Sequence, residues 1–134
     1  MDFIGGSTSL QVSHIDLADA HLSAYAGYEH GKLAKVAIIN MNAWNATQTG
    51  TRPVEEFGVP VPTGVKSVTV RFLTAPGADS WAPDRGISWA GRQWRWDTNL
   101  GEGFQAVKNT ITVNVIDGIA TVSVKDSEAI VVSW

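Results

Sequence analysis

Three histidines and a few carboxylates are the side chains most able to do acid–base or metal chemistry, and their spacing argues against a shared site. His14, His21 and His30 are separated by seven and nine residues, which fits no short metal-binding motif. Glu55 and Glu56 are the adjacent acids, but neighbours on a strand point to opposite faces and do not converge on one bond. We therefore expect no metal and no cofactor.

Other acids fall in an irregular stretch, residues 74–103, which is rich in proline and glycine. Their places beside turn-forming residues favour a role in turn geometry. The chain has no cysteine and no Gly-x-Ser-x-Gly motif, so thiol and serine nucleophiles of known pattern are excluded. We expect no catalytic residue; the rival hypothesis is a small hydrolase that uses acids of this stretch. The four acids are Asp79, Asp84, Asp97 and Glu102.

Tryptophan is the residue type that points to a ligand, with six in 134 residues. An exposed indole can stack on the apolar face of a sugar, although large aromatic side chains more often fill cores and interfaces. Trp89 is expected in the core, whereas Trp44 and Trp81 are flanked by loop residues and are expected to be exposed. Trp94 and Trp96 alternate, which predicts a common face, with arginines 92 and 95 placed to stack on them or pair with acids. The expected ligand-binding residues are Trp44, Trp81, Asp84, Arg92, Trp94 and Trp96.

Charge and composition restrict the partners. The net charge is −3 and the basic residues are scattered, so nucleic acid is an unexpected partner. No apolar run reaches 18 residues, so no membrane insertion is expected. Residues 1–6 lack the basic and apolar regions of a signal peptide. Asn45-Ala46-Thr47 is nevertheless an N-glycosylation sequon in a polar loop, which favours a secreted protein.

Alternation of apolar and polar residues predicts the strands. The pattern is clearest over 65–72, 110–116, 119–124 and 129–134, and Asp117-Gly118 is the pair preferred in a two-residue type I′ hairpin turn. The side chains expected to point inward are Val68, Val70, Phe72, Ile111, Val113, Val115, Ala120, Val122, Val124, Ile130 and Val132.

A second hairpin is predicted from 22–28 and 33–41, which flank His30-Gly31. Residues 36–39 are apolar on both faces, so this strand is expected to be central and covered on both sides. Further strands are expected near 56–61, 86–90 and 93–96. Residues 13–26 are the one segment in which a helix is considered, and even there a strand is favoured over a helix. The chain, 1–134, is predicted to be a single all-β domain, an antiparallel sandwich of about 7–9 strands.

Two segments carry a resemblance to a known family. Residues 71–80, Arg-Phe-Leu-Thr-Ala-Pro-Gly-Ala-Asp-Ser, and residues 87–91, Ile-Ser-Trp-Ala-Gly, resemble the C-terminal β domain of family 79 glycoside hydrolases. The hairpin from Ala24 to Asn42 and the closing Ser127–Val132 agree with it, so the likeness covers residues 20–134. Residues 1–19 are left as an N-terminal strand or arm, with 8–17 expected to supply a strand. The resemblance implies that the family's two catalytic glutamates lie on a separate (β/α)8 barrel, which this chain lacks.

Three functions follow as hypotheses. The leading one is a non-catalytic accessory or binding protein, in free-standing form a lectin-like or immunomodulatory fungal protein that contacts glycans or cell-surface receptors. The alternatives are a structural fragment of a family 79 enzyme and, less favoured, a small hydrolase with a site in the tryptophan-rich stretch. Because a sandwich that normally covers a barrel has an apolar face, we also expect a homodimer.

Overall fold

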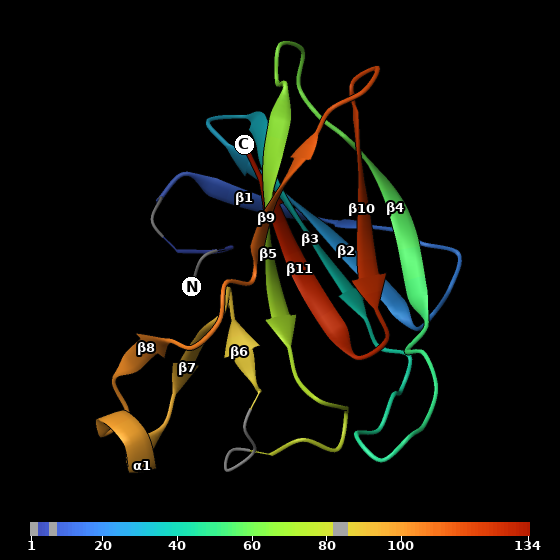
Figure 1. Cartoon of the computed structure of the whole chain (residues 1–134). Helices are drawn as coiled ribbons and strands as arrows, with labels where there is room; N and C mark the ends of the chain where they lie inside the picture. Colours follow the sequence, from blue (N-terminus) through green and yellow to red (C-terminus); the bar gives the residue numbers. More distant parts are fainter. Residues whose placement is uncertain (1–2, 6–7, 82–85) are drawn as a thin grey trace.

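Two antiparallel sheets form the fold in the computed structural model, which describes residues 3–5, 8–81 and 86–134 (Figure 1). The large sheet has the order β1-β2-β3-β11-β5-β6-β7-β8, with β9 also paired to β5, and the small sheet is β10-β4. The strands of the large sheet are β1 (Leu10–Ile15), β2 (Leu22–Glu29), β3 (Lys32–Asn40), β11 (Glu128–Ser133), β5 (Ser67–Thr74), β6 (Ser88–Trp89), β7 (Arg92–Trp94), β8 (Gly103–Gln105) and β9 (Thr110–Asn114). Those of the small sheet are β10 (Ile119–Lys125) and β4 (Val54–Pro60).

The hydrophobic core lies between the two sheets, where β4 and β10 cover β3, β11 and β5 (Figure 1). Alternate residues of β3, β5, β10 and β11 point into this layer, as the period of a strand requires. Apolar burial of this kind is the main stabilising contribution to such a sandwich. The buried residues of this core are Ala24, Val36, Ile38, Val59, Val68, Val70, Ala120, Val122, Val124, Ile130 and Val132.

The predicted hairpin of β2 and β3 is confirmed, but at Asp117-Gly118 only the turn is, because β9 pairs with β5 in the large sheet and β10 pairs with β4 in the small one. Asp117 and Gly118 have φ of 51° and 78°, and Ile116 and Ile119 exchange two backbone hydrogen bonds of 2.9 Å. Positive φ at both central residues is what a type I′ turn requires. His30 and Gly31 join β2 to β3 with φ of 52° and 74°. The His30-Gly31 turn therefore closes a paired hairpin, whereas the Asp117-Gly118 turn carries the chain from the large sheet to the small one.

The all-β sandwich is confirmed, but the described residues form eleven strands instead of 7–9. The difference lies in the irregular stretch, where β6, β7 and β8 are only two or three residues long. Strand β8 and the short helix α1 (Trp96–Asn99) were not predicted, because elements of this length carry too few residues to show a period. Residues 13–26 form parts of β1 and β2, as favoured.

Two burial expectations need correction. Strand β3 is central, with Val36 and Ile38 buried, but Ala37 and Ile39 are only half-buried because the second sheet covers one face alone. Ile111 was expected to point into the core, yet it is 49% exposed. It lines an open groove between β9 and β10, at the edge of the sandwich where the small sheet ends.

The N-terminal strand expected within residues 8–17 is present as β1, which pairs with β2 from Leu10↔Glu29 to Ile15↔Ala24. The rings of His14 and Tyr25 meet edge to face at 5.3 Å across this pair. β1 thus forms the edge of the large sheet. Within the described residues, no helix is both long and apolar enough to cross a membrane.

Candidate functional site

A small lobe built from β6, β7, α1 and β8 projects from the end of the large sheet, away from β4 and β10 (Figure 1). In the β7–β8 ribbon, Arg92 lies opposite Gln105 and Trp94 lies opposite Gly103. Residues directly opposite each other share a face of an antiparallel pair. One face of the ribbon therefore carries an arginine, a tryptophan, a glutamine and a glycine.

Trp94 lies across the neighbouring strand, over Gly103. A β-carbon at residue 103 would stand 2.6 Å from the Trp94 Nε1 and 3.0 Å from its Cε2. The indole thus fills the space that any larger residue at 103 would need. Trp94 is 55% exposed, so one side of the ring rests on the backbone and the other meets solvent.

Arg92 lies next to this ring. Its Nη2 donates a hydrogen bond of 2.9 Å to the Gly103 carbonyl oxygen, and it would lie 3.2 Å from a β-carbon at residue 103. Arg92 and Trp94 therefore converge on one glycine. The guanidinium has five N–H donors in a planar fork, and the bond to Gly103 uses one of them. The arrangement places a cationic donor group beside an exposed aromatic plane.

The predicted common face of Trp94 and Trp96 is wrong. Strand β7 ends at Trp94, and Trp96 begins α1, which turns the chain back toward β8. The turn closes through Leu100, whose φ of 49° is left-handed, followed by Gly101. Trp96 is 75% exposed and packs its ring edge over Gly101 instead of over Gly103.

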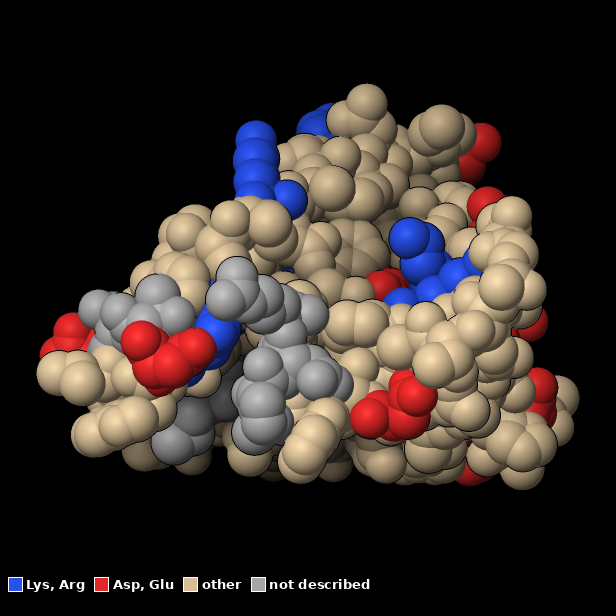
Figure 2. Space-filling view, turned by 60° about the horizontal axis from the view of Figure 1, so that its bottom comes forward, with Lys and Arg blue, Asp and Glu red and all other residues tan. Residues whose placement is uncertain are grey.

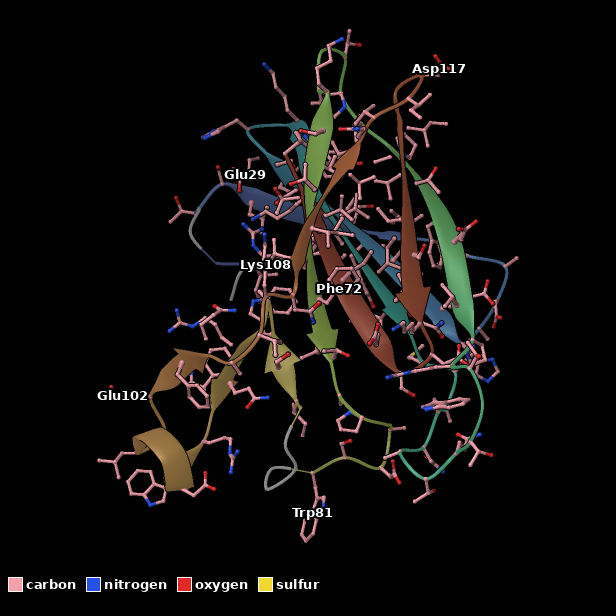
Figure 3. All side chains as sticks on the ribbon, viewed as in Figure 1. Glu29, Phe72, Trp81, Glu102, Lys108 and Asp117 are labelled. Carbon is pink, nitrogen blue, oxygen red and sulfur yellow. The ribbon has the colours of Figure 1, made fainter. Side chains whose placement is uncertain are left out.

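The remaining predicted ligand residues do not join this ribbon. Trp81 is 69% exposed, as expected, and points away from both sheets at the end of its loop (Figure 3). Trp44 was expected to be exposed but is half-buried, because its backbone is tied to Ser127 and Ala78. Asp84 lies outside the described residues. Trp89, expected in the core, is half-buried at the edge of the large sheet, opposite Leu73.

Two acids of the irregular stretch make contacts that hold the chain in place. Asp79 accepts a hydrogen bond of 2.8 Å from the Ala46 backbone N–H, and Asp97 pairs with Arg95. Glu102 lies at the tip of the lobe (Figure 3). Across the described ranges, no three histidine or acidic side chains come close enough together to hold a metal ion. Asp79 therefore links two loops that are 33 residues apart in the sequence, instead of closing a turn of its own as predicted.

The histidines lie apart, and His14 and His21 each have an aspartate partner two residues away. His14 Nδ1 and His21 Nδ1 each lie 3.2 Å from a nearby aspartate oxygen, that of Asp16 and Asp19 respectively. The His21 backbone N–H also donates to Asp19 at 2.8 Å, and this bond holds the pKa of the Asp19 carboxyl below its usual value. His30 is exposed at the hairpin tip, as predicted.

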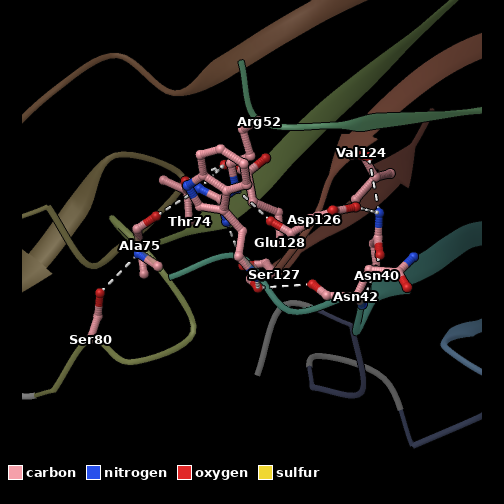
Figure 4. Close-up of polar contacts among 12 residues, drawn as sticks. Asn40, Asn42, Arg52, Thr74, Ala75, Ser80, Val124, Asp126, Ser127 and Glu128 are labelled. Atoms are coloured by element: carbon pink, nitrogen blue, oxygen red, sulfur yellow. Dashed lines mark hydrogen bonds and ion pairs between the residues drawn. The ribbon is translucent and has the colours of Figure 1, made fainter. Parts of the chain in front are cut away.

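A polar network that the sequence did not reveal joins the loops at one end of the sandwich (Figure 4). Arg52 donates to three backbone carbonyl oxygens, those of Asp126 at 2.5 Å, Ala75 at 2.9 Å and Ser127 at 3.0 Å. Its Nη1 also lies 3.7 Å from Glu128 Oε1. These partners are 23 to 76 residues away along the chain, so no local pattern marks Arg52. The network fixes three loops.

The outer face of the large sheet, on the side opposite β4 and β10, carries exposed apolar side chains. Met41 is 49% and Leu73 is 47% exposed, and they line an open groove of about 410 Å³ together with Ile39 and Ala129. We call these four residues the outer apolar patch. Large exposed patches of this kind mark interaction surfaces more often than isolated apolar residues do.

Acidic and basic side chains are interspersed over the face seen in Figure 2 and do not gather by sign. Asn45, the sequon asparagine, is exposed, and its backbone N–H donates to Gln48 within a tight loop turn. Its side chain is therefore accessible to modification.

Comparisons with a family model and with curated proteins both relate the chain to glycoside hydrolases. The family model described as the glycosyl hydrolase family 79 C-terminal beta domain matches residues 24–131. A beta-glucuronidase of Aspergillus niger is 27% identical over 96% of this chain and 26% of its own length. A beta-glucuronidase of Neurospora crassa is 29% identical over 71% of this chain and 20% of its own length.

The fold is also found in a solved structure. A 4-O-alpha-L-rhamnosyl-beta-D-glucuronidase from Fusarium oxysporum superposes with a TM-score of 0.75 at 24% identity, over 92% of this chain and 26% of that enzyme. The chain thus spans about a quarter of the length of the proteins it matches.

Proposed function

Because the chain belongs to the glycosyl hydrolase family 79 C-terminal beta domain family, we propose that it is the non-catalytic β domain of a glycoside hydrolase and supports a separate catalytic domain. One observation carries the proposal: the family match covers residues 24–131, whereas the glucuronidases it resembles are about four times as long. This favours the alternative of an enzyme fragment over a free-standing lectin-like or immunomodulatory protein. The catalytic acids would then lie outside this chain.

The outer apolar patch is the surface we assign to the catalytic domain. It lies on the face of the large sheet opposite β4 and β10, and its exposed Met41 and Leu73 favour burial against another domain. Interfaces between domains of one protein bury apolar surface of this kind. The substrate of such an enzyme would be a β-glucuronide, by analogy with the names of the two relatives. The accessible sequon at Asn45 supports an extracellular location.

A complementation experiment tests this function. The Aspergillus niger relative would be produced without its C-terminal quarter, alone and together with this chain, and the two assayed by size-exclusion chromatography and by hydrolysis of 4-nitrophenyl β-D-glucuronide. We expect the truncated enzyme to be insoluble or inactive alone and to form an active complex with the chain. Failure to associate, with the truncated enzyme fully active alone, would refute the supporting role.

A matched pair of variants locates the contact. Leu73→Glu places a charge in the outer apolar patch, whereas Val54→Glu places one on the small sheet, at a residue of nearly equal exposure (46% against 47%). Only Leu73→Glu is expected to abolish complex formation, because burying an unpaired carboxylate is costly. Equal loss with both variants would contradict the assignment of the surface.

A further inference from the structure

We propose that the β7–β8 ribbon binds a sugar that carries a carboxylate, a uronic acid, with Trp94 as the stacking surface and Arg92 as the carboxylate ligand. The inference rests on the joint placement of these two side chains over Gly103, in the lobe described above. It does not depend on the presence of a catalytic domain.

The first step is the aromatic plane. A pyranose ring has one face of C–H groups, and a planar aromatic side chain offers a complementary apolar surface for it. Trp94 meets this need because its indole rests on the Gly103 backbone and leaves the other side to solvent. A ring held against a strand in this way loses little freedom on binding, which lowers the entropic cost.

The second step is the charge beside the plane. Arg92 lies on the same face, and its Nη2 is fixed by the bond to the Gly103 carbonyl oxygen. A guanidinium offers two parallel N–H groups that match the geometry of a carboxylate. The other arginine of the lobe, Arg95, already pairs with Asp97. Arg92 is therefore the residue that selects an acidic sugar over a neutral one.

The third step distinguishes this tryptophan from the others that are exposed. Trp81 and Trp96 are more exposed, at 69% and 75%, but Trp81 lies in the chain that follows β5, and Trp96 packs by its edge against Gly101. Among the described residues, neither shares the face that carries Arg92. Exposure of a tryptophan is therefore not enough for the proposed site, which also needs the indole to be held in place beside a guanidinium, as Trp94 is beside Arg92.

The test uses two small sugars that differ in one group. Methyl β-D-glucuronide and methyl β-D-glucoside, a carboxylate against a hydroxymethyl group, would be titrated into the full chain while the indole N–H signals are followed by NMR. We expect a dissociation constant on the order of 1 mM for the glucuronide, a value typical of ligands of this size. The Trp94 signal should shift, the glucoside should bind about tenfold more weakly, and added salt should weaken only the glucuronide.

Variants separate the two roles. Arg92→Gln is expected to lower glucuronide affinity about tenfold and leave glucoside binding unchanged. Trp94→Ala should abolish both, Trp94→Phe should retain part of each, and Trp81→Ala, the control, should change neither. Backbone spectra of each variant report whether it is folded. No shift at Trp94, equal affinity for the two sugars, or an unaffected Arg92→Gln in a folded protein would overturn the proposal.

The two proposals fail separately. The sugar titration needs only this chain, whereas the complementation experiment reads out association with the truncated enzyme. Loss of sugar binding with intact complementation rejects the ribbon site alone. Intact sugar binding without complementation rejects the supporting role alone.

Discussion

The side chains of Asn40 and Asp126 meet across the end of the sandwich, with Asn40 Nδ2 donating to Asp126 Oδ1 at 3.1 Å. The two residues are 86 positions apart and both are buried. Asn40 also donates to the Val124 carbonyl oxygen at 3.4 Å and accepts from the Asn42 backbone N–H at 3.0 Å. One amide therefore joins β3, the β10–β11 turn and the loop that follows β3.

Asn40→Leu should lower the free energy of unfolding by about 2–3 kcal/mol, because it leaves the buried Asp126 carboxylate without this donor. Urea denaturation followed by tryptophan fluorescence measures the change. Asn114→Leu, at an exposed position of β9, is the control and should change stability by less than about 0.5 kcal/mol. Equal effects of the two variants would show that the Asn40 contacts contribute nothing specific.

Arg52→Lys should also destabilise the domain, by about 2 kcal/mol. A lysine keeps the charge but cannot direct donors to three carbonyl oxygens at once, as the guanidinium does for Ala75, Asp126 and Ser127. Thermal unfolding by circular dichroism measures the effect, with Lys125→Arg at an exposed strand residue as the reverse control. An unchanged melting temperature for Arg52→Lys would mean that charge, and not geometry, holds the loops.

Asn40 and Arg52 also show which features of the fold the sequence does not predict. Alternation identified β5, β10 and β11 with their inward residues, because a half-buried strand repeats every two residues and each strand is at least six residues long. Arg52 and Asn40 carry no such signal, since their partners are distant in sequence and their role exists only once the loops meet. Local pattern predicts elements; it does not predict which loops the fold brings together.

The candidate site also has residues that the sequence predicts and residues that only the structure reveals. The tryptophan-rich stretch was identified by composition, and Arg92 and Trp94 were among its expected residues. The prediction that Trp94 and Trp96 share a face was wrong, because the chain reverses between β7 and β8 and does so through α1, which begins at Trp96. Gly103, which supports the indole, was not predicted, since a glycine opposite a tryptophan is visible only once the strand register is known.

Removing residues 1–17 should lower the melting temperature and the solubility of the domain. The deletion takes away β1, which pairs with β2 over six residues, and exposes the hydrogen-bonding edge of β2. It also removes Ile15 and Leu17, which pack against the core. Free strand edges promote aggregation. Circular dichroism and light scattering measure both effects, and unchanged values would show that β1 is dispensable to the sandwich.

The outer apolar patch predicts how the isolated chain behaves without a catalytic domain. Met41 and Leu73, 49% and 47% exposed on an uncovered sheet face, should pair with the same patch of a second copy, because a two-fold contact buries both apolar surfaces at once. Light scattering at micromolar concentration should then give the mass of a dimer. Leu73→Glu should shift the mass to that of a monomer by bringing two carboxylates together in the contact, whereas Val54→Glu on the small sheet should leave the dimer intact. A monomeric wild-type chain would contradict the prediction, and a dimer that survives Leu73→Glu would move the contact to another face.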